Sequence, residues 1–375
     1  MFILNLLLFL IALSLLIFIH ELGHFIFAKL FNVYCMEFSL GMGPAVFSKK
    51  FKKDPETKYS LRYLPIGGYV AMAGEVQDDE QEKELNIPAE RTINGIKAWK
   101  RAIITVAGVT FNFILAIILI AIVSFSVGKP TNKIEVTNNS IAYNSGLRNN
   151  DKIISIDSNI ITRNEKEVYS TCIKESCKIN VVSDLSKIVN TITDKDVKFD
   201  STEYSQKIII KYIRNNETNT TTLTRTFDNE TNKVQMFGIA MIYDDYSFWG
   251  GIGETFKTFG DTIVAMFEAF GMLFTKEGIN QVGGPVQVYT YSVQMASKGI
   301  IPYLSFLALL SINLGFFNLL PIPGLDGARF YISIGEAITN KKFNPKIESY
   351  INMIGMLFLF GIMILVTIKD VFMLF

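Results

Sequence analysis

Two histidines and a glutamate near the end of the first apolar segment have the types and spacing of a metal-dependent hydrolytic site. The chain reads His20-Glu21-Leu22-Gly23-His24, an H-E-x-x-H pattern, and these are the only two histidines among the 375 residues. Four residues along a helix turn through about 400° and rise about 6 Å, so both imidazoles can ligate one zinc ion. Glu21 lies beside them, where a carboxylate can accept a proton from a metal-bound water. We therefore expect His20 and His24 to be zinc ligands and Glu21 to be the general base.

A catalytic zinc site needs a third protein ligand, and the chain has no further histidine to supply it. A carboxylate or a thiolate elsewhere in the membrane must then complete the site. Asp326 is the candidate, because it ends an apolar run in which Pro321 and Pro323 break the helix. An acid that only caps a loop is the alternative for Asp326. Two interfacial histidines without a metal are the alternative for the pattern itself, although burying such groups in an apolar helix is costly without a partner.

Four uncharged blocks position these residues, and each block is long enough to cross a bilayer. They are residues 1–19, 102–127, 299–325 and 350–368. About 20 helical residues span a hydrocarbon core of roughly 30 Å. The first block lacks a basic region before it and a small-residue cleavage site, so we expect a retained helix rather than a signal peptide. The sequence thus predicts an α-helical polytopic membrane protein with four transmembrane helices.

Basic residues near the ends of these blocks set the expected orientation. They gather at residues 49–53 and 97–101, between the first two blocks, and at residues 329–346, between the last two. Because short loops rich in Lys and Arg stay in the cytoplasm, both loops should be cytoplasmic and residues 128–298 should face outward. We therefore expect a multi-pass protein of the inner or plasma membrane with its active site toward the cytoplasmic side. Asp370, at the other end of the last helix, should lie across the bilayer from the site.

The remaining sequence divides into four expected regions. Residues 1–127 hold the first two helices and a membrane-associated β-hairpin or re-entrant loop at 33–75, in which Tyr59–Tyr63 and Tyr69–Met72 look like strands separated by glycine and proline. Residues 128–245 form one small β-rich domain, with strand-like runs at Lys207–Ile213 and Thr220–Phe227. Residues 246–298 hold a linker and an amphipathic helix, expected to lie in the outer interface rather than to form a fifth span. Residues 299–375 hold the last two transmembrane helices and the Leu325-Asp326-Gly327 motif.

The overall composition excludes several classes of function. Hydrophobic residues make up 49% of the chain, which is too apolar for an ordinary soluble enzyme. The 36 Lys and Arg residues balance 35 Asp and Glu residues, so no charge excess favours a nucleic-acid partner. Three cysteines are too few for a disulfide scaffold or a zinc site built from cysteine. Cys172 and Cys177 could form one disulfide on the outer side, whereas Cys35 has no partner in its compartment.

In the order of its motifs, the chain resembles the site-2 protease type of intramembrane zinc metalloprotease, and most closely the bacterial regulator-of-sigma-E protease branch. The resemblance covers nearly the whole length. The matching segments are His20–His24, Leu64–Val70, Gly108 with Asn112, a PDZ-like outward domain, and Asn318–Gly327. The chain departs from the family after Asp326, where Gly327-Ala328-Arg329 stands in place of Gly-Gly-His.

The resemblance implies a Zn²⁺ cofactor and roles for six residues. It makes His20, His24 and Asp326 the zinc ligands and Glu21 the catalytic base. Asn318 and Asn112 would hold substrate or support the site. The implied substrates are single-pass membrane proteins of the anti-sigma-factor or remnant-signal-peptide type, cut within or near their transmembrane helix during regulated intramembrane proteolysis. The exposed strand edge of the 33–75 loop could pair with such an unwound substrate; the alternative is a plain cytoplasmic β-hairpin.

The outward domain has one stretch similar to PDZ domains, Ser140–Ile156, in which a small-residue turn and short helix lead to a strand. Asn150 stands where a glycine is usual before Asp151, and asparagine accepts the left-handed conformation better than most residues. We expect this domain to exclude substrates whose outer part has not been trimmed. Two rival functions remain at this stage: a catalytically inactive PDZ-bearing membrane adaptor, and an intramembrane metal transporter, which would leave Glu21 unexplained and would be expected to show an internal repeat.

Overall fold

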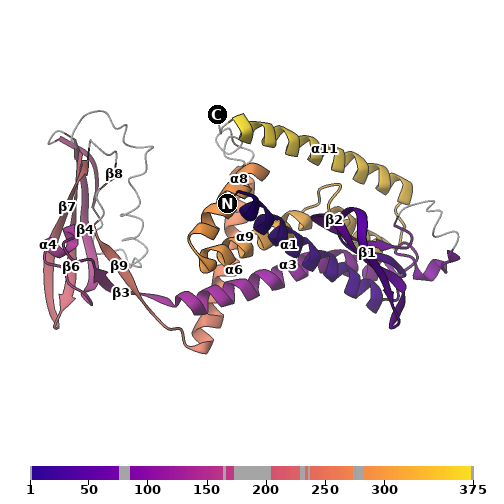
Figure 1. The fold of residues 1–375 in the computed structure, drawn as a ribbon, viewed down its shortest axis with the longest axis horizontal. Helices are drawn as coiled ribbons and strands as arrows, with labels where there is room; N and C mark the ends of the chain where they lie inside the picture. Colours follow the sequence, from indigo (N-terminus) through magenta and orange to yellow (C-terminus); the bar gives the residue numbers. More distant parts are fainter. Residues whose placement is uncertain are drawn as a thin grey trace. The chain divides into compact units, whose positions relative to one another are not determined.

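The computed structural model describes residues 2–75, 85–163, 166–172, 204–228, 233–234, 237–272, 275 and 283–372. The chain forms two compact units, one made of Met1–Ser126 with Phe248–Phe375 and the other of Val127–Ser247. The first unit contains the long helices and the long hairpin, and the second contains most of the strands and the short helix α4 (Ile141–Asn144) (Figure 1). Cys177 and the side chain of Cys172 lie outside the described part of the chain, so the expected disulfide does too.

Within the described residues, four helices of the first unit are long and apolar enough to cross a membrane, as the uncharged blocks predict. They are α1 (Phe2–Leu30), α3 (Ala98–Val127), α9 (Ile300–Leu319) and α11 (Pro345–Phe372). Each helix runs beyond its uncharged block except α9, which ends before Pro321 because proline cannot continue the hydrogen-bond pattern. Four such helices fit a polytopic membrane protein in contact with the lipid bilayer.

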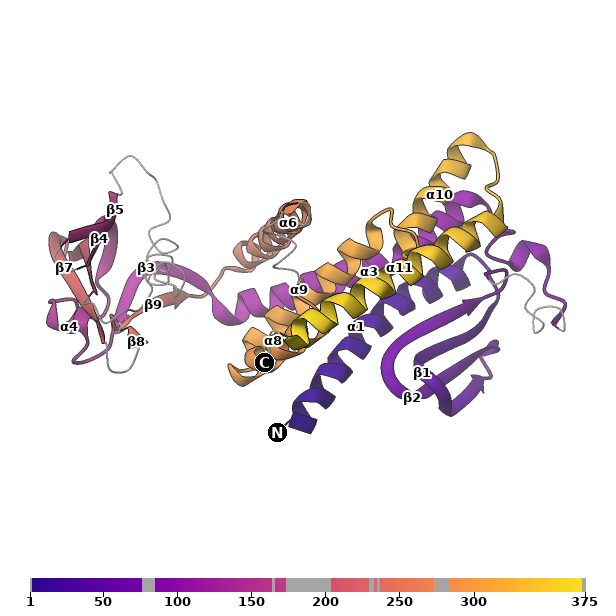
Figure 2. The same ribbon diagram turned by 90° about the horizontal axis from the view of Figure 1, so that it is seen from above.

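A long hairpin, β1 (Cys35–Phe51) and β2 (Asp54–Met72), follows α1 and lies beside it (Figure 2). The two strand-like runs expected in this loop belong to one continuous strand, β2, which turns at Gly67 with φ of 84° instead of breaking there. The first part of β1 has a β2 partner on both sides, since Phe38 is in register with both Val70 and Tyr59. This pairing packs the hairpin on α1 through a buried cluster that includes Phe25 and Phe38, whose rings stack 4.8 Å apart.

The described part of the first unit also contains three other α-helices and the 3₁₀ helix η1 (Ala89–Arg91). The amphipathic helix α6 (Phe248–Met272) contains the segment expected to lie in the interface, and it is not among the four helices apolar enough to span. Helix α8 (Pro285–Ser297) lies in the region where only a linker was expected after the amphipathic helix, and it packs against α9. Helix α10 (Asp326–Thr339) begins directly after the proline-containing break that follows α9.

The second unit is built on a seven-stranded sheet with the order β8-β7-β6-β4-β3-β9, in which β5 pairs with β4. Its core gathers buried residues from several strands, including Ile134, Ile210 and Phe237. Asn150 adopts φ of 68°, which confirms the expected left-handed turn before Asp151. The elements are β3 (Lys129–Val136), α4 (Ile141–Asn144), β4 (Lys152–Arg163), β5 (Lys166–Cys172), β6 (Tyr204–Arg214), β7 (Glu217–Asp228), β8 (Lys233–Val234) and β9 (Ile239–Asp244).

Candidate metal centre

His20, His24 and Asp326 meet in the first unit although 302 residues separate the last two. Their Nε2 and Oδ2 atoms form a triangle: 3.2 Å between the two histidines, 2.8 Å from His20 to Asp326, and 3.1 Å from His24 to Asp326. Both histidines are buried. Among the described residues, these three form a group of potential ligand atoms within 4.8 Å of one another.

The sides of this triangle suit a tetrahedral zinc ion. Zinc bonds of about 2.0–2.1 Å to nitrogen and oxygen place neighbouring ligand atoms roughly 3.3 Å apart in a tetrahedron. The observed separations of 2.8, 3.1 and 3.2 Å are close to that value. Two imidazoles and one carboxylate are also a donor set found in catalytic zinc sites that keep a fourth position open.

Hydrogen bonds on the far side of each imidazole orient its ring. His24 Nδ1 lies 2.8 Å from the carbonyl oxygen of Ile104, so this nitrogen donates its proton and leaves the lone pair on Nε2. His20 Nδ1 lies 3.0 Å from the side-chain amide nitrogen of Asn112, which is fully buried. The amide oxygen of Asn112 has no hydrogen-bond partner. When Nε2 of His20 ligates a metal, Nδ1 carries the proton of the ring. Rotation of the Asn112 side-chain amide by 180° then places its unpaired oxygen where it can accept a hydrogen bond from Nδ1.

Close approach between α1 and α3 makes room for the imidazoles. Gly108 in α3 lies directly against them: a Cβ atom there would lie 2.4 Å from His24 Nε2 and 2.8 Å from His20 Cε1. On α1, a Cβ atom at Gly23 would lie 2.5 Å from the carbonyl oxygen of Ala107. Only glycine fits at both positions without displacing the helices or the histidines.

Asp326 reaches the site because the chain breaks and restarts there. Residues 320–325 are not helical, and Asp326 is the first residue of α10. The turn is tight at Gly327, where a Cβ atom would lie 2.1 Å from the carbonyl oxygen of Leu320. Burial alone would raise the pKa of Asp326, but the adjacent His24 and His20 hold it well below its ordinary value.

Glu21 lies between the two histidines in sequence and next to β2 in space. A Cβ atom at Gly68 would lie 3.5 Å from Glu21 Cγ, in ordinary van der Waals contact. The hairpin thus brings its strand Gly68–Met72 alongside the residue expected to act as base.

Two ion pairs fasten α10 to the rest of the site. Arg329 pairs with Glu75, which follows β2, and Arg101 of α3 pairs with Glu336 near the end of α10. Arg101 also donates a hydrogen bond of 2.9 Å to Ser333. Arg329 occupies the position at which the chain departs from the family motif, so this departure places a cation where it holds the helix that carries Asp326.

The structure locates the two asparagines differently. Asn112 contacts His20 from inside the helix pair, whereas Asn318 is half-buried in the last turn of α9. Within the described residues, the side chain of Asn318 forms no hydrogen bond. The sequence alone gave no role to Ile104, Glu75 or Ser333, because backbone carbonyls and distant polar partners leave no pattern in the chain.

Comparisons with known proteins agree with this chemistry. The model of peptidase family M50 matches residues 8–362. A protein of Fusobacterium nucleatum named as a zinc metalloprotease is 33% identical over 371 residues, covering 97% of this chain and 98% of its own length. A protein of Clostridium perfringens with the same designation is 33% identical over 368 residues, covering 96% and 97%. A protein of Enterococcus faecalis named as the protease Eep is 28% identical over 442 residues, covering 97% of both chains. The chain therefore belongs to peptidase family M50, the site-2 protease family of zinc metalloproteases.

Proposed function

We propose that this metalloprotease hydrolyses a peptide bond within or at the edge of a substrate's transmembrane helix. In this proposal His20, His24 and Asp326 bind the zinc ion and Glu21 is the general base. The observation that carries it is the convergence of one carboxylate oxygen, from Asp326 in α10, on two imidazole nitrogens of the apolar helix α1, at 2.8 and 3.1 Å and next to Glu21 in the sequence.

The protein's own residues perform the proton transfers and the orientation. When bound, zinc would lower the pKa of water toward about 7 and polarise the scissile carbonyl group. Glu21 takes the proton of the attacking water and gives it to the leaving amine. Asn112 and the Ile104 carbonyl group hold the two imidazoles in the required tautomers.

The free edge of β2 offers a place for an unwound substrate. Gly68–Met72 pair with β1 on one side, and no other described strand pairs with them. A scissile bond in a helix keeps its carbonyl hydrogen-bonded, so the substrate must unwind and can then pair with this edge. Asn318, with its free side-chain amide, would hold the substrate from α9.

The wider biological setting is also part of the proposal. Both loops rich in Lys and Arg would be cytoplasmic, which places the metal centre on the cytoplasmic side and the Val127–Ser247 unit outside, in a multi-pass protein. That unit would act as a PDZ-like filter against untrimmed substrates. The substrates would be single-pass proteins such as anti-sigma factors or remnant signal peptides in regulated intramembrane proteolysis.

The test combines zinc analysis with cleavage of a model single-pass substrate by the purified chain in detergent. Wild type, Glu21→Gln and the exposed control Glu90→Gln should all bind zinc, and only Glu21→Gln should fail to cleave. Asp326→Asn should lose both activity and much of its zinc. Cleavage by Glu21→Gln would refute the proposed base, and an inert wild type with stoichiometric zinc would favour an adaptor or a transporter.

A further inference from the structure

A second polar site lies away from the metal centre, at the opposite end of α11. The Asp370 side chain is 1% exposed there, although α11 is otherwise an exposed apolar helix. Its Oδ2 accepts a hydrogen bond of 3.1 Å from the backbone nitrogen of Gln287 in the first turn of α8. Its Oδ1 is buried and has no partner. The carboxylate therefore has half of its acceptor capacity unused in a place where burying a charge is expensive.

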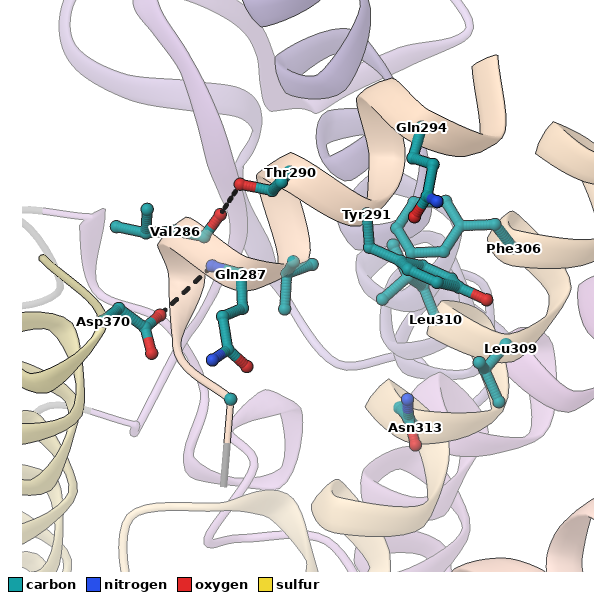
Figure 3. A pocket seen from close by; sticks show the side chains of 12 residues that line it. Val286, Gln287, Thr290, Tyr291, Gln294, Phe306, Leu309, Leu310, Asn313 and Asp370 are labelled. Atoms are coloured by element: carbon teal, nitrogen blue, oxygen red, sulfur yellow. Dashed lines mark hydrogen bonds between the residues drawn. The ribbon is translucent and has the colours of Figure 1, made fainter. Parts of the chain in front are cut away.

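Asp370 is one of the residues that line a cavity, although its carboxylate is itself almost fully covered. The cavity has a volume of about 520 Å³ and is lined by α8, α9 and Asp370 (Figure 3). The close approach of α11 to α8 depends on Gly284, where a Cβ atom would lie 2.6 Å from Asp370 Oδ2. Among the described residues, no lysine or arginine forms an ion pair with Asp370.

The remaining lining suits a cation with an apolar stem. The rings of Tyr291 and Phe306 meet at 5.6 Å in an edge-to-face arrangement, and both line the cavity (Figure 3). Asn313 and Gln294 add amide groups that form no side-chain hydrogen bonds within the described part of the chain. A carboxylate, an aromatic face and free amide oxygens together bind ammonium or guanidinium groups.

The position of the cavity favours a substrate side chain over a lipid headgroup. Phe306, Leu310 and Asn313 lie on one face of α9, and this helix leads to Asn318 and the break before Asp326. The distance from this region to the metal centre can be estimated along α1. Tyr289 of α8 contacts Phe9 at 5.6 Å, and Phe9 precedes His20 by 11 residues, or about 16 Å of helix.

We infer that this cavity binds a lysine or arginine side chain of the substrate's transmembrane helix, on the outward side of the scissile bond. The inference rests on the proposed function and names the substrate class that the site prefers. If the substrate stays helical, its basic residue lies about 11 positions from the scissile bond. If the substrate is unwound near the zinc, the basic residue lies about 7 positions from that bond. A basic residue at that depth is unfavourable in lipid, so binding to Asp370 favours transfer of such helices into the enzyme.

The experiment measures two substrates that differ at one position. A model single-pass helix carries either Lys or Leu at successive positions 6–12 residues outward of its cleavage site. Full-length wild type, Asp370→Asn and the exposed control Asp261→Asn are assayed in proteoliposomes, and zinc content is measured for each. We expect Asp370→Asn to raise KM about tenfold for the best Lys substrate, with kcat and the Leu substrate unchanged within twofold. Asp370→Lys should restore binding when the substrate carries Glu instead.

Further variants keep the inference testable apart from catalysis and folding. Binding of the Lys and Leu substrates to Glu21→Gln, measured by crosslinking, should show the same preference without turnover. Tyr291→Leu, at a half-exposed site, should weaken the Lys preference severalfold even if Asp370→Asn does not fold. An equal rise in KM for the Lys and Leu substrates would overturn the inference, because it would mean that Asp370 only caps the first turn of α8. A Lys preference that vanishes when phosphatidylethanolamine is omitted would overturn it in favour of a lipid headgroup.

Discussion

Gly108 provides the sharpest test of how closely the metal centre is packed. In Gly108→Ala the added methyl group would lie 2.4 Å from His24 Nε2, which is 1.0 Å inside the 3.4 Å at which ordinary contact begins. It would also lie 2.7 Å from His24 Cε1 and 2.8 Å from His20 Cε1. Both imidazoles must then move, and a displacement above about 0.5 Å exceeds what a metal site tolerates.

The size of the effect follows from two opposing terms. Overpacking of this kind costs about 1–3 kcal/mol, whereas replacing glycine by alanine inside a helix stabilises the fold by about 0.5–1 kcal/mol. The net loss of folding stability therefore lies between about 0 and 2.5 kcal/mol, and it falls at the lower end when the imidazole side chains move and the helices do not. The strain falls on the imidazoles, so we expect the zinc Kd to rise about 10- to 100-fold and cleavage to fall at limiting zinc.

The assay is competition with a fluorescent zinc chelator, together with thermal unfolding of the zinc-free proteins in detergent. Gly260→Ala in α6 is the matched control, because a Cβ atom there has no neighbour within 4 Å. Zinc-free Gly108→Ala and wild type should unfold at similar temperatures. A folded Gly108→Ala whose zinc Kd stays within twofold of wild type would refute the reasoning. A large loss of stability in the zinc-free variant would show that the helix pair, not the imidazoles, absorbs the strain.

Three further predictions concern the groups around the site. Asn112→Leu should weaken zinc binding about 10- to 100-fold, because His20 Nδ1 loses its partner; an unchanged Kd in the same competition would contradict this. Arg329→Gln and Glu75→Gln should each lower kcat/KM severalfold, and the double variant should be no worse than either, whereas additive losses would mean that the pair does not act as a unit. Arg91 donates two hydrogen bonds of 2.8 Å to Glu56 and lowers the pKa of that carboxyl group. The contribution of this ion pair to the stability of the hairpin is therefore fully present above about pH 4.3 and is lost as the pH falls through the pKa of Glu56 in the folded protein. Hydrogen-exchange protection factors of residues 54–72, corrected for the intrinsic pH dependence of exchange, should fall over that range in wild type and less in Glu56→Gln.

Much of the helical architecture follows from the sequence because its causes are local. Long uncharged runs predict α1, α3, α9 and α11, and prolines predict the end of α9. The strand runs in the second unit and the left-handed Asn150 are also set by neighbouring residues. In the hairpin, β2 turns at Gly67, and the run that follows pairs with Phe38 on the side opposite to Tyr59, a pairing that depends on tertiary packing and that local residues do not predict.

In the candidate metal centre, too, some features follow from the sequence and others depend on tertiary packing. The four-residue spacing of His20 and His24 places both imidazoles on one face of α1, since helical periodicity is fixed by the backbone. Asp326 could be selected from the sequence only as the acid that ends an apolar run broken by prolines, and its approach to within 2.8 Å of His20 depends on packing between α1 and the start of α10. The orienting contact of Asn112 with His20 depends likewise on how closely α3 packs against α1.

By itself, the sequence determined the groups available to this protein: two imidazoles, a neighbouring carboxylate proposed as the base, and four long apolar segments. The tertiary structure alone decided which distant groups complete the site. It also brought the buried carboxylate of Asp370 to the cavity between α8 and α9. The physical reason is that hydropathy and helical period act between near neighbours in the chain, whereas contacts such as Gly108 with the imidazoles or Asp370 with Gln287 arise only when separate helices pack.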